Sequence, residues 1–385
     1  MMGVYSRKER IDMEMKRVPE IRFEGFDGEW EQRKLCEMQQ DGELSLKRGN
    51  IIPKQEGRYP VYSSSAVGDG LFCTSDNFMF DDEKVTWSID GGGRVFYRPK
   101  HKFSVTNVCG YVDILDKDLD CKYLSLAMEK AWKQTSFDYI TKAHPSVISD
   151  LYSISIPGTD EQKDIGVTNN YIDTFIALTQ QKLDSLKSIK ACMLQKMFPR
   201  DGKKVPEIRF EGFTDPWEQR KVKELCSITT GKSNTQDQID DGKYPFFIRS
   251  DTPVRSNRYL YDEEAVITIG DGNIGKVFHY VNGKFDLHQR CYKMSDFTDV
   301  LAKYFYYFFS SHFYDRAMKM TAKATVDSVR LEMISDMEIL FPKSRDEQRS
   351  IAECLTALDN LITLHQRKYS GLVQIKKALL QKMLV

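Results

Sequence analysis

The chain repeats one stretch of its own sequence, and this repeat limits the folds open to it. Residues 18–34 read VPEIRFEGFDGEWEQRK and residues 205–221 read VPEIRFEGFTDPWEQRK, with three differences at a constant offset of 187. A shorter match lies further along each half, where Glu161-Gln162-Lys163 returns as Glu347-Gln348-Arg349. Matching landmarks at both ends of each half predict two tandem copies of one module, each about 180 residues long.

A tandem duplication can fold into a body with approximate two-fold symmetry, and duplex DNA is a partner with nearly that symmetry. The charge balance limits how DNA could be held, because 56 Lys and Arg oppose 56 Asp and Glu and leave a formal net charge of zero. A protein that held nucleic acid by bulk electrostatics would be strongly basic. Any DNA contact must therefore use locally placed groups or positive charge on a partner.

Each half begins with short runs of aromatic and β-branched residues between turn residues, which predict strands. In the first half these runs are 59–62, 84–89, 94–97 and 103–113, and in the second half 244–247, 265–269, 276–281 and 285–294. Helical stretches at 122–134 and 299–318 follow, before a closing strand that ends at Pro157 or Pro342. The pattern predicts an α+β fold with two mixed α/β modules.

The rear part of each half has a heptad-like apolar stripe. This spacing predicts two long helices that pair antiparallel as a coiled coil, act as a spacer and give a pseudo-two-fold arrangement. An amphipathic helix lying on a domain core is the alternative. The predicted seam or partner-contact residues are Ile172, Ile176, Leu183, Leu186, Leu358, Ile362, Leu372 and Leu379.

We accordingly predict five segments along the chain. They are a lead-in at 1–17, a first module at 18–158, a first spacer helix at 159–200, a second module at 201–343 and a second spacer helix at 344–385. The lead-in carries charges of both signs and lacks the apolar stretch of a secretory signal, so a short helix or a disordered segment is expected.

Motifs for catalysis are missing from the sequence. It contains no GxxxxGK[ST], HExxH or GxSxG pattern and no CxxC pair, so we predict no catalytic residue and no metal site. Gly270–Gly275 matches GxGxxG, but strand-like residues follow where a dinucleotide site needs a helix, so a hairpin turn is expected. The eight cysteines are expected to be buried free thiols, and no stretch has the length and apolarity of a membrane helix.

Polar, small-residue loops recur at matching places in the two halves. Small residues allow a close backbone approach, while Lys, Arg, Ser, Thr and Asn can contact phosphates or base edges. For any one of these residues a plain solvated loop is the alternative. The candidate DNA contacts are Ser63, Ser64, Ser65, Gly91, Gly92, Arg94, Lys142, His144, Ser146, Arg249, Ser250, Gly272, Asn273, Lys276, Thr321, Lys323 and Thr325.

The chain resembles a type I restriction–modification specificity subunit. The resemblance lies in the opening Val-Pro-Glu-Ile-Arg-Phe-Glu-Gly-Phe with Trp-Glu-Gln-Arg-Lys, the Tyr-Pro strand and the glycine-rich turn. It continues in the Ile-Pro or Phe-Pro strand end, which is followed by Glu-Gln and a long helix. These features occur in the same order in both halves, from residue 18 to residue 383.

The resemblance implies two target-recognition domains, each of which reads half of a bipartite sequence in double-stranded DNA. Two methyltransferase subunits would dock on the chain, bind S-adenosylmethionine and methylate adenine, and restriction/translocase subunits would use ATP and Mg. The chain itself would bind no cofactor and catalyse nothing, in a bacterial cytoplasm. Its divergent stretches, roughly 35–150 and 222–335, would read two different half-sites.

Two other functions are compatible with the residues. One is a stand-alone DNA methyltransferase or nuclease, against which the missing motifs argue. The other is a coiled-coil scaffold that binds only other proteins.

Overall fold

The computed structural model describes residues 18–64, 68–137, 142–200, 202–320 and 328–385. Its contacts divide the chain into two compact units. Unit 1 contains residues up to 180 together with 368–385, and unit 2 contains residues 181–367. Each unit contains a mixed α/β region and parts of two long helices that pack together, which confirms the predicted α+β class. None of the described helices has both the length and the apolarity to cross a membrane.

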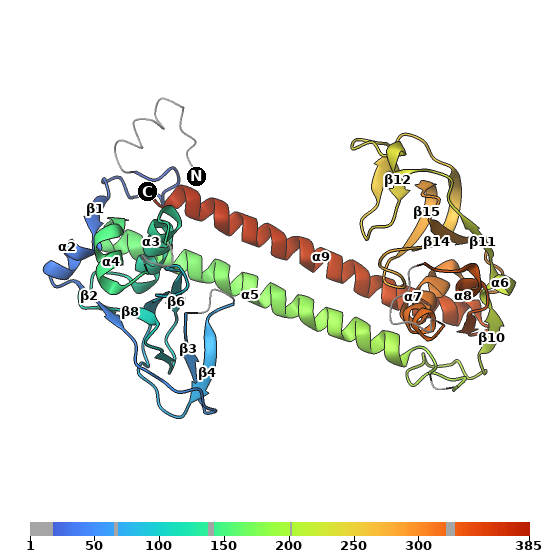
Figure 1. Cartoon of the computed structure of the whole chain (residues 1–385), viewed down its shortest axis with the longest axis horizontal. Helices are drawn as coiled ribbons and strands as arrows, with labels where there is room; N and C mark the ends of the chain where they lie inside the picture. Colours follow the sequence, from blue (N-terminus) through green and yellow to red (C-terminus); the bar gives the residue numbers. More distant parts are fainter. Residues whose placement is uncertain (1–17, 65–67, 138–141, 201, 321–327) are drawn as a thin grey trace. The chain divides into compact units, whose positions relative to one another are not determined.

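Unit 1 contains three sheets (Figure 1). A two-stranded sheet pairs β1 (Glu31–Lys34) with β9 (Ser153–Ile156). The four-stranded sheet has the order β2 (Leu44–Arg48), β8 (Cys109–Ile114), β5 (Lys84–Ser88) and β6 (Val95–Arg98). The three-stranded sheet has the order β4 (Leu71–Ser75), β3 (Tyr59–Tyr62) and β7 (Ser104–Val105).

In the described part of unit 1 the mixed region also contains the shorter helices α2 (Leu35–Gln40), α3 (Cys121–Gln134) and α4 (Pro145–Leu151). The Asp120 side chain caps α3 by accepting a hydrogen bond from the Tyr123 amide at 2.7 Å. Helix α3 packs on β5 and β6 and contributes the buried Tyr123, Leu124 and Met128 to the core of the unit.

Unit 2 joins most of its strands into one sheet. The strand β10 (Glu218–Lys221) pairs with β17 (Glu338–Phe341). The six-stranded sheet has the order β11 (Ser227–Thr230), β16 (Cys291–Ser295), β14 (Tyr261–Ile269), β15 (Phe278–Leu287), β12 (Tyr244–Phe247) and β13 (Val254–Ser256). Its short helices are α6 (Val222–Leu225), the 3-10 turn η1 (Thr235–Asp237), α7 (Ala302–Lys319) and α8 (Leu331–Ser335).

A proline explains why the sheets of the two units differ. In unit 1, β6 pairs with β5 as far as Arg98, and Pro99 follows. In unit 2, Asn282 stands at the matching position and pairs with Glu264 inside the long strand β15. Proline lacks the N–H that a central strand must donate. The strand therefore stops in unit 1, whereas in unit 2 it continues to Leu287 and links the two halves of the sheet.

Two predicted strands are wrong in the same way. The runs 103–113 and 285–294 each contain a turn, which separates β7 from β8 and β15 from β16. A backbone hydrogen bond of 2.9 Å closes each turn, from Cys109 to Thr106 and from Cys291 to His288. Neither turn contains glycine or proline, so the sequence offered no turn-forming residue from which to predict it. The cysteines were predicted to be buried free thiols. All eight are free, but the Cys192 side chain is exposed.

The repeated sequence signature forms the same clamp in each unit. In unit 1, Arg22 donates two hydrogen bonds to Glu161, at 2.6 and 2.7 Å, and the Trp30 indole N–H donates to the same carboxylate at 3.2 Å. In unit 2, Arg209, Glu347 and Trp217 make the same contacts at 2.7, 2.9 and 3.2 Å. Both carboxylates are almost fully buried. The clamp fixes the start of each long helix to the beginning of its own repeat.

The neighbouring glutamine fixes the helix start a second time. Gln162 donates to the Pro157 carbonyl at 3.0 Å and accepts from the Asp120 amide at 3.0 Å. Gln348 makes the equivalent bonds to the Pro342 carbonyl and from the Leu301 amide, at 2.8 and 2.7 Å. A buried polar group has to satisfy its hydrogen bonds, so the repeated Glu-Gln pair has a structural role.

The long helices are α5 (Thr159–Lys196) and α9 (Arg345–Met383). Parts of both run antiparallel within each unit. In unit 1 Ile165 shares a core with Met383, and Asp173 forms an ion pair with Lys376. In unit 2 Lys190 forms an ion pair with Asp359. Among the predicted seam residues, Leu183 and Leu186 are buried, and the partly buried ones are Ile172, Ile176, Leu358, Ile362, Leu372 and Leu379.

Candidate nucleic-acid interface

Three loops of unit 1 that carry predicted DNA contacts come together. Ser64 follows β3, and its hydroxyl donates to the carbonyl of Val108 and accepts from the Asp90 amide at 3.3 Å. Lys142 forms a 2.8 Å ion pair with Asp90, which follows β5. Residues far apart in the sequence therefore form one polar cluster, which we call the unit 1 loop cluster: Ser63, Ser64, Asp90–Gly93 and Lys142–His144.

Close packing accounts for the glycines of this cluster. A Cβ at Gly91 would lie 2.1 Å from the Ser88 hydroxyl and 2.3 Å from the Ser64 carbonyl oxygen, so no larger residue fits. Gly92 has a φ of +77°, which L side chains rarely adopt, and its carbonyl accepts from the Trp132 indole at 2.6 Å. These glycines shape the loop, and their backbone is the only part that DNA could contact.

The remaining predicted residues of unit 1 have different surroundings. Ser63 accepts a hydrogen bond from the Thr106 hydroxyl at 3.0 Å, and the Arg94 guanidinium lies 4.9 Å from the centre of the Phe96 ring. His144 is the residue before α4, which begins at Pro145. The prediction that Ser146 belongs to a loop is wrong, because it lies in the first turn of this helix. Proline at the first helical position favours the helix start there.

Unit 2 brings together the equivalent loops with different side chains. Arg249 follows β12, and its Nη1 lies 3.2 and 3.3 Å from the two oxygens of Asp271, which follows β14. Arg290, in the turn before β16, donates to the same carboxylate at 2.6 Å. We call Arg249, Asp271–Asn273 and His288–Arg290 the unit 2 loop cluster. It contains two guanidinium groups and one carboxylate.

The electrostatics of this cluster keep Asp271 ionised. Partial burial by itself raises the pKa of Asp271, but hydrogen bonds from Arg290 and Arg249 outweigh burial and hold that pKa below its ordinary value. Burial, together with the two nearby guanidinium groups, lowers the pKa of His288. A neutral His288 can accept with Nδ1, which lies 3.1 Å from the Arg290 amide.

Other predicted residues of unit 2 are tied to its fold. The Ser250 carbonyl lies 3.2 Å from Nε2 of His279, and the Ser250 hydroxyl donates to the Thr252 carbonyl at 2.6 Å. Lys276 lies 5.5 Å from the centre of the Tyr314 ring. Gly272 and Asn273 form the turn after Asp271. Ser65, Thr321, Lys323 and Thr325 lie outside the described residues.

Backbone hydrogen bonds establish which loop positions match. The Ile89 amide bonds to the Val108 carbonyl at 2.9 Å, as the Gly270 amide bonds to the Arg290 carbonyl at 2.7 Å. Asp90 and Asp271 come one residue later and are therefore equivalent. Arg290 matches Val108, whose side chain carries no charge. The sequence comparison missed Arg290 and Asp271, although a shared Asp-Gly after a strand in each half was a signal for the carboxylate.

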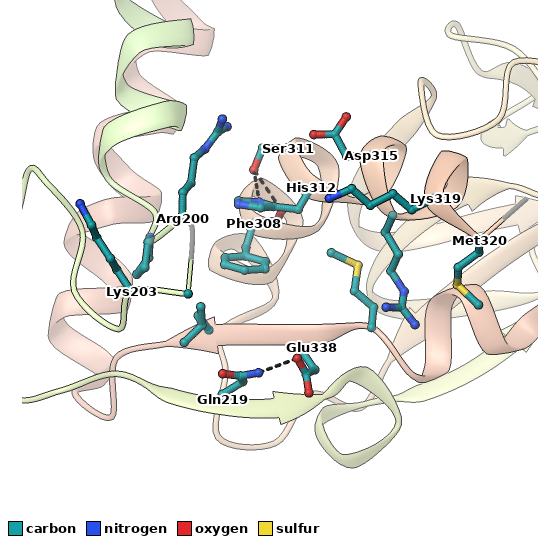
Figure 2. Close-up of a pocket in the computed structure, with 15 residues that line it drawn as sticks. Arg200, Lys203, Gln219, Phe308, Ser311, His312, Asp315, Lys319, Met320 and Glu338 are labelled. Atoms are coloured by element: carbon teal, nitrogen blue, oxygen red, sulfur yellow. Dashed lines mark hydrogen bonds between the residues drawn. The ribbon is translucent and has the colours of Figure 1, made fainter.

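A separate cavity of about 560 Å³ lies in unit 2 between the end of α5, α7 and β17 (Figure 2). None of the predicted DNA contacts that the structure describes lines it. Its lining carries charges of both signs, which are Arg200, Lys203, Arg316, Lys319, Asp315 and Glu338. His312 stacks on Phe308 at 4.2 Å, and burial lowers the pKa of this histidine, so the ring is neutral at pH 7. The residues that line this cavity and the residues of the unit 2 loop cluster are different sets.

Comparison with known proteins identifies the family to which the chain belongs. The chain matches the family described as "Type I restriction modification DNA specificity domain" twice, over residues 28–188 and 214–374. The two matches cover most of the chain and correspond to its two repeats. The chain therefore belongs to this family of type I restriction–modification specificity subunits and carries the domain in duplicate.

Individual relatives agree with the family match. The specificity subunit of the type I restriction enzyme MjaVIII from Methanocaldococcus jannaschii is 22% identical over 371 residues, which cover 86% of each chain. A type I specificity subunit from Mycoplasma pneumoniae is 26% identical over 254 residues, covering 61% of this chain and 66% of the relative. The alignment with a second M. pneumoniae subunit is 37% identical and spans 48% of that protein.

A solved structure has the same fold. The crystal structure of a type I restriction–modification S subunit from M. genitalium superposes with a TM-score of 0.74 at 17% identity. The superposition covers 96% of this chain and 99% of the other. The common fold thus extends over both mixed α/β regions and both long helices.

Proposed function

We propose that this chain recognises a bipartite sequence in double-stranded DNA and positions other subunits of a type I restriction–modification complex on it. The observation that carries the proposal is the pair of loop clusters. Each of the two family domains has one cluster, built on matching backbone hydrogen bonds but with different side chains. One scaffold with two sets of contacting groups is suited to reading two different half-sites.

The predicted domain division fits this role. We propose that 18–158 and 201–343 act as the two target-recognition domains, with 159–200 and 344–385 as spacer helices and 1–17 as a lead-in. The candidate DNA contacts are the described loop residues together with Ser65, Thr321, Lys323 and Thr325, for which the sequence is the only support.

An exposed apolar stripe supports the docking of partner subunits. Along α5 in unit 1, four large apolar side chains are each more than half exposed and recur at intervals of three or four residues: Val167, Tyr171, Phe175 and Leu178. This spacing places them on one face of the helix. Contiguous exposed apolar surface is typical of protein–protein contact. We propose that a methyltransferase subunit covers this stripe, and that a second one uses the other repeat.

Catalysis belongs to the partners in this proposal. Methyltransferase subunits would supply S-adenosylmethionine and methylate adenine, and restriction/translocase subunits would supply ATP hydrolysis with Mg. The chain contributes sequence choice and geometry. The zero net charge fits this division, since basic surface on the partners would help to enclose the DNA. A bacterial cytoplasm is the expected location.

The test compares the purified chain with and without its methyltransferase partner on a library of random-sequence duplexes. Selection by gel shift should enrich one bipartite sequence, and methyl transfer from S-adenosylmethionine should require the partner. Turnover by a homogeneous preparation of the chain alone would contradict the non-catalytic role. Failure of the complex to select any sequence would favour a scaffold that binds only proteins.

A further inference from the structure

We infer that Arg290 reads a guanine in the half-site recognised by unit 2, with Asp271 as its positioning residue. This inference rests on the proposed DNA-recognition function and extends it to one residue and one base. Neither residue was among the contacts predicted from the sequence.

The backbone of Arg290 is fixed on both sides. Its amide donates to Nδ1 of His288 at 3.1 Å, and its carbonyl accepts from the Gly270 amide at 2.7 Å. The following residue, Cys291, is fully buried and begins β16. The side chain therefore leaves the sheet from a well-defined point, which is a requirement for reading a base edge.

Asp271 positions the guanidinium group of Arg290 but accepts a hydrogen bond from only one of its nitrogens. Only Nη1 of Arg290 bonds to Asp271, at 2.6 Å, and the side chain is 60% exposed. Arginine carries five N–H donors in a planar fork, so with respect to the residues that the structure describes, donors remain available for another acceptor pair. The O6 and N7 atoms of guanine form such a pair in the major groove, and arginine is their commonest protein partner.

The carboxylate of Asp271 favours a base over a phosphate as that acceptor. Hydrogen bonds from Arg249 and Arg290 keep Asp271 ionised, so a negative charge lies beside the fork. The carboxylate cancels part of the positive charge of Arg249 and Arg290 and so weakens the attraction for a phosphate, whereas contact with the neutral edge of a base does not depend on that charge. The carboxylate also limits the rotamers of Arg290, which reduces the ordering cost on binding.

Unit 1 has no arginine at the position equivalent to Arg290. Val108 stands where unit 2 has Arg290, and Ser64 stands where unit 2 has Arg249. The carboxylate of Asp90 there pairs with Lys142 from another loop. The inferred guanine contact is therefore specific to one half-site.

The experiment maps methylated adenines across the genome of cells whose only specificity protein is the tested chain, expressed with its methyltransferase partner. The substitution Arg290→Gln keeps a polar side chain, Arg290→Val gives the residue of unit 1, and Lys343→Ala removes an exposed, ion-paired cation of unit 2 as a charge control. Thermal unfolding of each purified chain checks that it folds.

With the unchanged chain and with Lys343→Ala, one half-site should contain a fixed guanine. With Arg290→Gln and Arg290→Val, discrimination for that guanine should fall roughly tenfold or more, and the other half-site should be unchanged. Asp271→Asn should relax the same position less.

Two outcomes would overturn the inference while the proposed function stands. One is a motif that stays strict at every position in both Arg290 variants. The other is methylation that falls equally at all sequences, which would indicate a phosphate contact. If the unchanged chain yields no methylated bipartite motif, the proposed function itself fails, and the inference fails with it.

Discussion

Asp90 in unit 1 and Asp271 in unit 2 occupy equivalent positions after equivalent strands. The cationic side chains that form ion pairs with them come from different loops. Asp90 pairs with Lys142, which precedes α4. Asp271 pairs with Arg249, which follows β12, and with Arg290, in the turn before β16. The strand end and the backbone hydrogen bond just before the carboxylate match in the two units, while the groups that the carboxylate holds differ in number, chemistry and origin.

The start of each long helix shows the opposite behaviour. The clamp of Arg22, Trp30 and Glu161 in unit 1 is repeated in unit 2 by Arg209, Trp217 and Glu347, with bond lengths that differ by no more than 0.2 Å. Contacts that fix a helix to its module are thus kept in duplicate, whereas loop contacts vary. This contrast is expected of a protein whose scaffold is shared and whose two recognition surfaces differ.

The largest predicted effect comes from breaking the shared clamp. Glu161→Ala and Glu347→Ala each leave a mostly buried arginine without its carboxylate partner, and we expect each to reduce the free energy of unfolding by about 3–5 kcal/mol. Urea denaturation of the two variants measures this cost. Glu353→Ala, on the exposed face of α9, is the control and should cost little.

The equivalence of the two clamps is contradicted if Glu161→Ala and Glu347→Ala reduce the free energy of unfolding by very different amounts. A large effect in one unit with an effect below about 1 kcal/mol in the other would mean that the repeated clamp stabilises only one of them.

A smaller effect is expected at the helix ion pairs. Asp173 in unit 1 accepts from Lys122, which is nearly buried, and from Lys376. Asp359 in unit 2 accepts from Lys190 and from the Tyr307 hydroxyl. Asp173→Ala should cost about 2 kcal/mol because it leaves the Lys122 ammonium without its ion partner. Asp359→Ala should cost about 1 kcal/mol because Lys190 is more exposed.

Chemical denaturation ranks these two variants, and Lys122→Met supplies the check. Removing Lys122 together with Asp173 should recover part of the loss, since no buried charge then remains. An equal or larger cost for Asp359→Ala would show that burial of the lysine does not decide the difference.

The smallest predicted effect concerns acid. The pKa of Asp271 is depressed in the folded chain, so its contribution to stability is present above the unfolded value of about 3.9 and is lost as pH falls through the folded pKa. Carbon NMR of the carboxyl group should show this low pKa. In Arg290→Gln the pKa should rise because one of the two arginine partners is lost, whereas Lys343→Ala should leave it unchanged. An unchanged pKa in Arg290→Gln would mean that Arg249 alone sets it.

The sequence predicted the parts of the fold that its repeats and periodicity record. The α+β class, the tandem modules and the long helices followed from matches such as Glu161 with Glu347 and from apolar spacing along α5 and α9. Pairing across the sheets did not follow, because turns such as His288–Arg290 contain no glycine or proline. The effect of Pro99, which divides one sheet of unit 1, could be understood only from the paired strands.

The candidate site was predictable as loops but not as contacts. Gly91, Lys142 and Arg249 were among the candidates predicted from the sequence, and they lie in the loop clusters of the structure. Arg290 was missed because the equivalent residue, Val108, has no charge, so nothing in the repeat drew attention to it. Ion pairs between loops that lie far apart in the sequence depend on the tertiary fold.

The central claim is that the two units read separate half-sites, and one measurement tests it most directly. Residues 222–335 are replaced by the equivalent segment of a relative, and methylated adenines are mapped in cells that supply the methyltransferase partner. We predict that one half-site changes completely, while the other half-site and the spacer stay the same, because the clamp residues and both long helices lie outside the replaced segment. A motif in which both half-sites change, or neither does, would contradict the account.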